Sequence, residues 1–191
     1  MKVLLIDNNT KHLKELRDLI EGCGHTSDTI KYTEASSAIA DRYDLSIITG
    51  GHLLAIPNHK EDLAPQIAMI KDMQKPLLGI CHGFQLIAYT FGAKLHYRTE
   101  RLKGIIEVNV SKTDPIFGEL TKFDAFVSHK YYIMRLPKEL IELARSKYNI
   151  EALKHNNRPI YGFQFHPEVI TPGNTSGQIL INLFREIEKR S

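Results

Sequence analysis

Short apolar runs alternate with amphipathic segments through the first half of the chain. Three of these runs are apolar enough to be buried on both faces, as the strands of parallel sheets are: residues 3–6, 45–49 and 76–80. Between them, apolar residues recur at helical spacing, which predicts helices near residues 13–23, 34–40 and 62–73. We expect the order β-α-β-α-β-α-β, with 76–80 as its fourth strand. This order predicts an α/β fold on an open, doubly wound, mostly parallel sheet of the flavodoxin-like type.

Beyond Gly92 the pattern changes to short alternating strands, which predict an added antiparallel region: residues 104–110, 122–127, 142–144, 150–154 and 160–165. The polar turn at 155–159 is a hairpin signal. A final helix at 176–189 carries one apolar stripe, formed by Ile179, Leu180, Leu183, Phe184 and Ile187. For the first helix we expect Thr10 as the N-cap and Gly22 or Gly24 as the stop. No linker or repeat separates the halves, so we expect a single domain over residues 1–191.

The composition argues against several classes of protein. The 191 residues are 42% hydrophobic and carry a formal charge of +3, from 25 Lys and Arg against 22 Asp and Glu, without a basic block. Neither disorder nor nucleic-acid binding is indicated. Two cysteines, Cys23 and Cys81, are too few for a disulfide scaffold and fit a reducing, cytoplasmic compartment. The first apolar run ends at Asp7, too soon for a signal peptide, and no stretch is long enough to span a membrane.

Cys81 lies at the centre of the segment Gly-Ile-Cys-His-Gly at residues 79–83, directly after a predicted buried strand. The two glycines form the frame of a nucleophile elbow, a strained strand-to-helix turn that neighbouring segments approach closely. The helix that follows directs its free N–H groups and its positive dipole end at the sulfur, which favours the thiolate. Cys23 has no such frame, and we interpret it as a core residue.

A thiol nucleophile needs a base, and the base needs a group that orients it. His166 and Glu168 are the candidates, since they follow the predicted strand 160–165 with only a proline between them. Both side chains should emerge at the carboxyl edge of the sheet, where ligands bind in open α/β folds. The other histidines lack the spacing of metal ligands, so we expect no metal site and no cofactor in this chain.

Four motifs, in this order along the chain, resemble those of the class I, or triad, glutamine amidotransferases. They are Thr49-Gly50-Gly51, Gly79-Ile80-Cys81-His82-Gly83-Phe84-Gln85, Ser128-His129, and Gly162-Phe163-Gln164-Phe165-His166-Pro167-Glu168. The resemblance spans nearly the whole chain. It implies the class I amidotransferase fold and a Cys-His-Glu triad that hydrolyses glutamine.

The resemblance implies a role for each matched residue. Cys81 attacks the side-chain amide of glutamine to form a γ-glutamyl thioester, His166 accepts and donates the proton, and Glu168 fixes the imidazole. Backbone N–H groups of Gly51 and His82 hold the oxyanion, as expected for an elbow nucleophile. The substrate is contacted by three further residues: Gln85, Ser128 and His129.

Some positions depart from the common family pattern. His52 stands where a proline usually follows the two glycines, and His82 and Phe84 replace the more usual Leu and His of the elbow. None of these three is a triad member. Because the oxyanion donors are backbone groups, His82 still permits that contact, whereas His52 indicates an unusually shaped loop after Gly51.

The resemblance also implies a partner. The family passes ammonia to a synthetase, and this chain has no P-loop pattern, so ATP and Mg²⁺ belong to a separate ATP-pyrophosphatase subunit. The segments around Ser128 and 159–169 are most similar to those of separate glutaminase subunits of GMP synthetase, although Lys130-Tyr131 replaces the usual Met-Asp. Three alternatives stay open: a glutaminase subunit for another acceptor such as chorismate, a stand-alone γ-glutamyl thiol hydrolase, and a non-catalytic binding protein.

Overall fold

Strands and helices alternate through the first half of the computed structural model, which describes residues 1–51 and 54–189. The strands are β1 (Lys2–Asn8), β2 (Thr26–Lys31), β3 (Leu45–Gly51), β4 (Leu77–Ile80), β5 (His96–Val110), β6 (Lys122–Tyr132), β7 (Leu140–Arg145), β8 (Ile150–His155) and β9 (Ile160–Phe163). The helices are α1 (Leu13–Gly22), α2 (Ser37–Ala40), α3 (Ala64–Asp72), α4 (His82–Thr90) and α5 (Gly177–Glu188), with 3-10 turns η1 (Tyr32–Glu34), η2 (Ile56–Asn58) and η3 (Pro115–Phe117). Within the described residues, the strands form one nine-stranded sheet in the order β2-β1-β3-β4-β9-β8-β7-β5-β6.

The sheet is mixed. The neighbours from β2 to β9 pair in parallel, and those from β9 to β6 pair antiparallel. The predicted α/β fold with a parallel core and an antiparallel region is therefore confirmed, but the sheet is half antiparallel rather than mostly parallel. β9 joins the halves, and its Phe163 lies beside Ile80 of β4. This pairing brings the segment after β9 next to the segment after β4.

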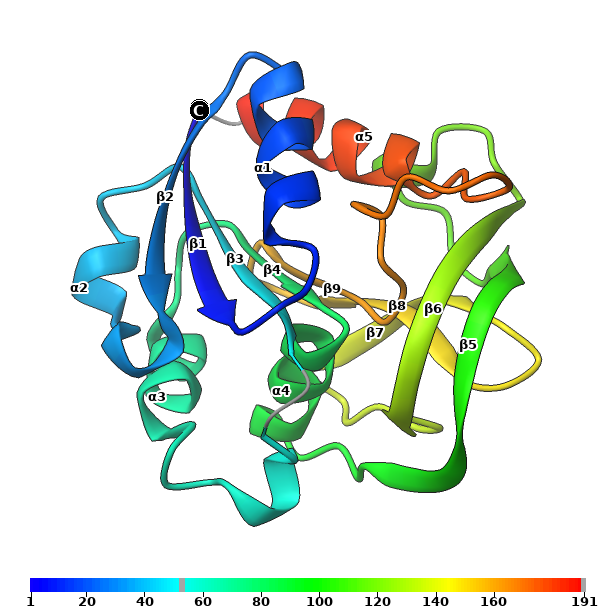
Figure 1. Ribbon diagram of the computed structural model, residues 1–191, viewed down its shortest axis with the longest axis horizontal. Helices are drawn as coiled ribbons and strands as arrows, with labels where there is room; N and C mark the ends of the chain where they lie inside the picture. The colour runs from blue at the N-terminus through cyan, green and yellow to red at the C-terminus, as the bar shows by residue number, and fades with distance from the viewer. Residues whose placement is uncertain (52–53, 190–191) are drawn as a thin grey trace.

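Helices cover both faces of the parallel half, as a doubly wound sheet requires (Figure 1). On one face, α1 and α5 share a core with Leu5 of β1 and Leu16 of α1. On the other face, α2, α3 and α4 share a core with Leu4 of β1 and Ile70 of α3. Because successive residues of β1 face different cores, the strand is apolar throughout. The predicted apolar stripe of α5 is buried in the first core.

Local details of the first segments differ from the sequence prediction. α1 begins at Leu13 with His12 as its N-cap, so Thr10 is not the cap; the Thr10 hydroxyl instead accepts the His12 N–H two residues further on, before the helix begins. The helix ends at Gly22, and Gly24 adopts φ +79°, in agreement with the predicted stop. Strand β2 had no apolar signal because it is an edge strand whose residues are exposed or only half-buried.

Candidate active site

Cys81 lies in the single-residue turn between β4 and α4. Its backbone has φ +51° and ψ −95°, a conformation that costs a non-glycine residue strain and that is found at functional turns. The Cys81 N–H donates to the Phe163 carbonyl oxygen at 2.7 Å, which ties the turn to the end of β9. The predicted nucleophile elbow is present in the fold.

The two glycines of the elbow are sites of close backbone approach. A Cβ on Gly79 would lie 2.4 Å from the carbonyl carbon of Gly83, and a Cβ on Gly83 would lie 2.2 Å from the Ile48 carbonyl oxygen. Both distances are shorter than any real contact of a Cβ atom. The glycines let α4 pack directly on β3 and β4, which sets the position of Cys81.

Replacing Gly83 by alanine should therefore lower the free energy of unfolding by about 2 to 4 kcal/mol, because backbone must move to admit the methyl group. The matched control is Gly22→Ala, at the end of α1, where a Cβ would meet no atom within 4 Å. That control should leave stability unchanged or raise it by up to about 1 kcal/mol. Urea unfolding of the two variants measures both values; equal stabilities would contradict the packing described for the elbow.

The amino end of α4 faces the turn that holds Cys81. The first helical bond runs from the Gln85 N–H to the Cys81 carbonyl oxygen, so the three preceding N–H groups have no partner within the helix. These groups and the helix dipole favour negative charge at the turn. The His82 side chain is buried, and burial lowers its pKa to about 4, so the imidazole is neutral.

His166 and Glu168 form a buried pair beside Cys81. The distance from His166 Nδ1 to Glu168 Oε1 is 2.8 Å, and since a carboxylate accepts, Nδ1 donates. The other ring nitrogen is left for the Cys81 side chain, with which His166 also forms a hydrogen bond. Burial opposes the charged imidazole, but Glu168 and Cys81 together raise the pKa of His166 well above its ordinary value. The arrangement favours an imidazolium paired with a thiolate.

The imidazole of His166 is held on several sides. The His166 N–H donates to the Phe126 carbonyl oxygen of β6 at 2.8 Å, and the ring packs edge-on against His12 with centroids 5.5 Å apart. Gly50 makes room for the ring, because a Cβ there would lie 3.1 Å from the His166 Cε1. The Asn174 side chain donates to the His166 carbonyl oxygen at 3.1 Å. His12 and Asn174 were not predicted from the sequence, because they lie outside the four motifs.

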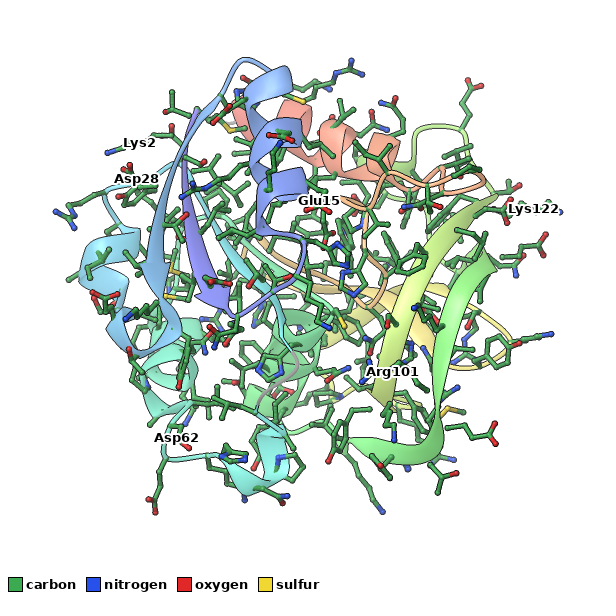
Figure 2. The ribbon with its side chains drawn as sticks, in the orientation of Figure 1. Lys2, Glu15, Asp28, Asp62, Arg101 and Lys122 are labelled. Atoms are coloured by element: carbon green, nitrogen blue, oxygen red, sulfur yellow. The ribbon has the colours of Figure 1, made fainter. Side chains whose placement is uncertain are left out.

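Two cavities meet at Cys81. One, of about 200 Å³, is lined by residues that include Gly51, His82, Gln85, Ser128 and His129, which are all the predicted oxyanion and substrate residues. The other, of about 460 Å³, is lined by His166 and by the basic side chains of Lys11, Arg101 and Lys103. Arg101, which Figure 2 labels beside β6, lines both. The structure thus gathers the predicted residues around one sulfur atom, and their roles there stay predictions.

The predicted substrate and oxyanion residues are held by their neighbours. Gly51 is packed so closely on Asn8 of β1 that a Cβ would lie 2.7 Å from the Asn8 carbonyl oxygen. The Ser128 carbonyl oxygen accepts from Arg101 at 3.1 Å. His129 donates from Nδ1 to the Tyr131 carbonyl oxygen at 2.9 Å, and burial lowers the pKa of its imidazole to about 3. His52, for which an unusual loop was predicted, lies outside the described residues.

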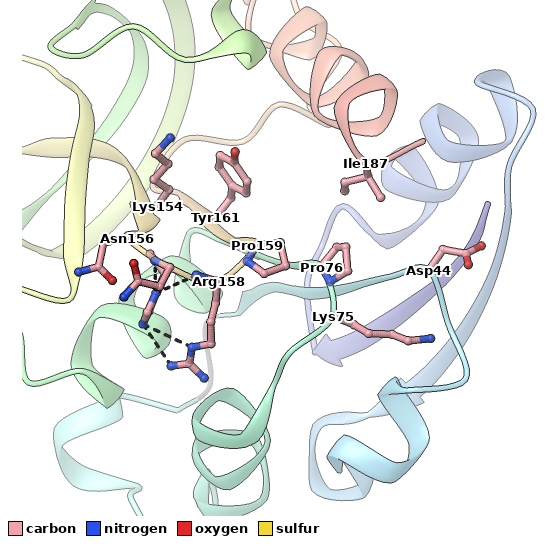
Figure 3. Close-up of a pocket in the computed structure, with 11 residues that line it drawn as sticks. Asp44, Lys75, Pro76, Lys154, Asn156, Arg158, Pro159, Tyr161 and Ile187 are labelled. Atoms are coloured by element: carbon pink, nitrogen blue, oxygen red, sulfur yellow. Dashed lines mark hydrogen bonds between the residues drawn. The ribbon is translucent and has the colours of Figure 1, made fainter. Parts of the chain in front are cut away.

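A hollow of about 600 Å³ lies at the opposite edge, where the parallel strands begin (Figure 3). Its cationic side chains already have protein partners. Arg158 donates to the carbonyl oxygens that end α3, Lys75 donates to the carbonyl oxygen of Asp41, and Lys154 pairs with the buried Asp114 at 2.6 Å. This hollow therefore has a structural explanation and lies away from Cys81.

Two features are absent from the described part of the chain. No group of three or more His, Cys, Asp or Glu side chains in residues 1–51 and 54–189 is placed to hold a metal ion. Among the helices within the same residues, none has the length and apolar character needed to cross a membrane.

Comparison with known proteins agrees with this site. The family model for class-I glutamine amidotransferases matches residues 4–187. The glutamine-hydrolyzing subunit of GMP synthase from Methanococcoides burtonii is 33% identical over 98% of this chain and 97% of its own. Anthranilate synthase component 2 of Saccharolobus solfataricus is 30% identical over 96% of this chain and 98% of its own. A crystal structure of the corresponding GMP synthase subunit from Thermoplasma acidophilum superimposes with a TM-score of 0.85 at 28% identity, covering 99% of this chain and 98% of that one.

The chain therefore belongs to the class I glutamine amidotransferase family, which confirms the resemblance seen in the sequence. It is an enzyme of that class, and its domain is the one that acts on glutamine. Its relatives include proteins with different printed functions, so the acceptor of the ammonia is a separate question.

Proposed function

We propose that this chain is the glutaminase subunit of a two-subunit GMP synthetase. It hydrolyses glutamine through a thioester on Cys81 and delivers the ammonia to a separate ATP-dependent synthetase, which aminates XMP to GMP. The observation that carries the glutaminase step is the buried contact of 2.8 Å between His166 and Glu168, made directly beside the sulfur of Cys81. The acceptor is supported by relatives of matching length that are glutamine-hydrolyzing subunits of GMP synthase.

In this mechanism the Cys81 thiolate attacks the side-chain carbonyl carbon of glutamine, and the negative charge moves to the carbonyl oxygen. The backbone N–H groups of Gly51 and His82 stabilise that oxyanion. The His166 imidazolium then gives its proton to the departing nitrogen, which leaves as ammonia, and the acyl group remains as a γ-glutamyl thioester. Water attacks the thioester while His166 accepts its proton, and glutamate leaves as the thiolate re-forms.

The chain's charges suit both the substrate and a partner. The basic side chains of Lys11, Arg101 and Lys103 line the larger cavity at Cys81, and the residues that line it include no acid. They would attract the α-carboxylate of glutamine and, at the rim, an acidic surface of the synthetase. Ile170, two residues after Glu168, is 86% exposed, which is unusual for an isoleucine and suits a docking contact. We propose that the partner covers this mouth, including residues 54–57, 130–132 and 169–173.

A partner of this kind predicts that the isolated chain is a poor glutaminase. Losing one oxyanion donor costs about 10²- to 10³-fold in kcat, so a misaligned peptide at Gly51 is enough to keep the enzyme idle until the synthetase docks. We therefore expect glutaminase kcat/KM to rise at least about 10²-fold when synthetase, ATP and XMP are added. The control is the chorismate-using component of anthranilate synthase with chorismate.

The second candidate is a subunit of anthranilate synthase, which the 30% identical relative favours. Stimulation by the chorismate-using component alone would replace GMP synthetase with that enzyme. A full rate in the isolated chain, unchanged by either partner, would overturn the subunit proposal in favour of a stand-alone γ-glutamyl hydrolase.

A further inference from the structure

A second carboxamide, Gln164, lies against the sulfur of Cys81. Gln164 follows β9, its side chain has no solvent exposure, and its Nε2 is 3.7 Å from Cys81 Sγ, within hydrogen-bond range for sulfur. Its Oε1 accepts from Gln85 Nε2 at 3.1 Å. The sequence places this polar residue between Phe163 and Phe165, at the end of an apolar strand. That interruption of a buried run is the signal by which it could have been found.

The surroundings decide which end of the Gln164 carboxamide faces the sulfur. The Tyr131 carbonyl oxygen can only accept, so the Gln85 group that approaches it at 2.9 Å is the NH₂ group. The second hydrogen of this NH₂ group needs an acceptor, which is the Gln164 oxygen. The Gln164 nitrogen is then directed at Cys81 Sγ. A flipped Gln164 would place two NH₂ groups together and turn an oxygen to the thiolate.

The main chain holds the same arrangement. The Gln164 N–H donates to the Glu151 carbonyl oxygen of β8 at 2.8 Å, and the neighbouring Cys81 N–H is bound to Phe163. Both sides of the contact are therefore fixed by the sheet. The position of the Gln164 amide follows from Tyr131 through Gln85, and both hydrogens of the Gln85 NH₂ group are used in this way. Any direct contact of Gln85 with substrate is left to its oxygen.

We infer that Gln164 is a positioning residue, whose carboxamide holds the Cys81 sulfur and stabilises its thiolate, with Gln85 and the Tyr131 carbonyl fixing its orientation. A hydrogen bond to the charged form of a group favours that form, so this donor raises the share of thiolate at neutral pH. The same donor stabilises the sulfur when it leaves as a thiolate during hydrolysis of the thioester. The inference rests on Cys81 being the nucleophile of the proposed function.

Other charged groups face the same sulfur and have to stay constant in a test. His166 approaches it from the segment after β9, and the side chains of Lys11, Arg101 and Lys103 line the cavity into which it opens. Changing Gln164 leaves all four in place. A shift in the titration of Cys81 then reports the lost donor.

The experiment is the pH profile of iodoacetamide alkylation of the whole chain, in a Cys23→Ser background so that only Cys81 is measured. Replacing Gln164 by methionine removes the donor at similar size, and should move the midpoint of the alkylation profile up by about one pH unit. With glutamine and the synthetase, this variant should lose kcat about tenfold, by the same conversion, with KM unchanged. The matched control is Gln178→Met on the exposed face of α5, which should change neither value.

An unchanged midpoint in a folded Gln164→Met chain would overturn the inference. If that variant fails to fold, Gln85→Met decides, because it frees the Gln164 amide to turn; a smaller upward shift supports the inference and no shift overturns it. The alkylation assay needs neither glutamine nor a partner. Failure of the proposed function would appear separately, as a wild-type chain that does not hydrolyse glutamine.

Discussion

Replacing Cys81 by alanine should abolish glutamine hydrolysis, with a loss of at least about 10⁴-fold in kcat, while the chain stays folded. The reason is that no other side chain at the site can form the thioester. Steady-state glutaminase assays in the presence of the synthetase measure the loss, and circular dichroism checks the fold. Cys81→Ser should be nearly as inactive, because His166 and the helix end are matched to a thiolate.

The matched control for this prediction is Cys23→Ser. Cys23 ends α1, is only half-buried and packs at the margin of a core, and burial raises the pKa of its thiol, so it lacks every feature of a nucleophile. The variant should retain wild-type activity. Glutamine hydrolysis that survives in Cys81→Ala, or that disappears in Cys23→Ser, would show that the nucleophile has been misassigned.

Within the triad, His166→Ala should cost more than Glu168→Gln. His166 transfers the proton itself, so its loss should approach that of Cys81, about 10⁴-fold or more in kcat. Glu168 acts through the imidazole, whose Nδ1 it holds at 2.8 Å, and a glutamine in its place can still accept from that nitrogen with its oxygen. The Glu168→Gln variant should therefore lose less, about 10²- to 10³-fold.

The comparison needs both variants at several pH values. Glu168 is one of the groups that raise the pKa of His166, so Glu168→Gln should lower that pKa and move the acidic limb of the kcat profile to lower pH. The same profile measured for the wild type gives the reference. Equal or reversed losses in the two variants would mean that the proton-transfer and orienting roles have been exchanged.

Local sequence patterns were sufficient for most of the parallel half of the fold. The apolar runs at 45–49 and 76–80 became β3 and β4, since a strand buried on both faces carries few polar residues. β2 could not be found in this way, because it lies at the edge of the sheet and has no fully buried residue. The insertion of β9 beside β4 was also invisible, since pairing between distant segments leaves no periodic signal.

The site was predictable to a similar extent. The glycines at 79 and 83 could be assigned because a close backbone approach excludes every side chain, and the structure shows the contacts that require them. The pair of His166 and Glu168 is local in sequence and was also found. The contact between Gln164 and Cys81 joins residues 83 positions apart, so only the folded sheet reveals it.

The most direct test of the proposed chemistry is covalent labelling with a diazo-ketone analogue of glutamine, followed by peptide mass mapping of the whole chain. We expect one adduct, on the peptide that contains Cys81. Excess glutamine should slow its formation, and the Cys81→Ser variant should show none. An adduct on Cys23, or labelling of Cys81 that glutamine does not slow, would contradict the claim that this sulfur is the nucleophile of a glutamine site.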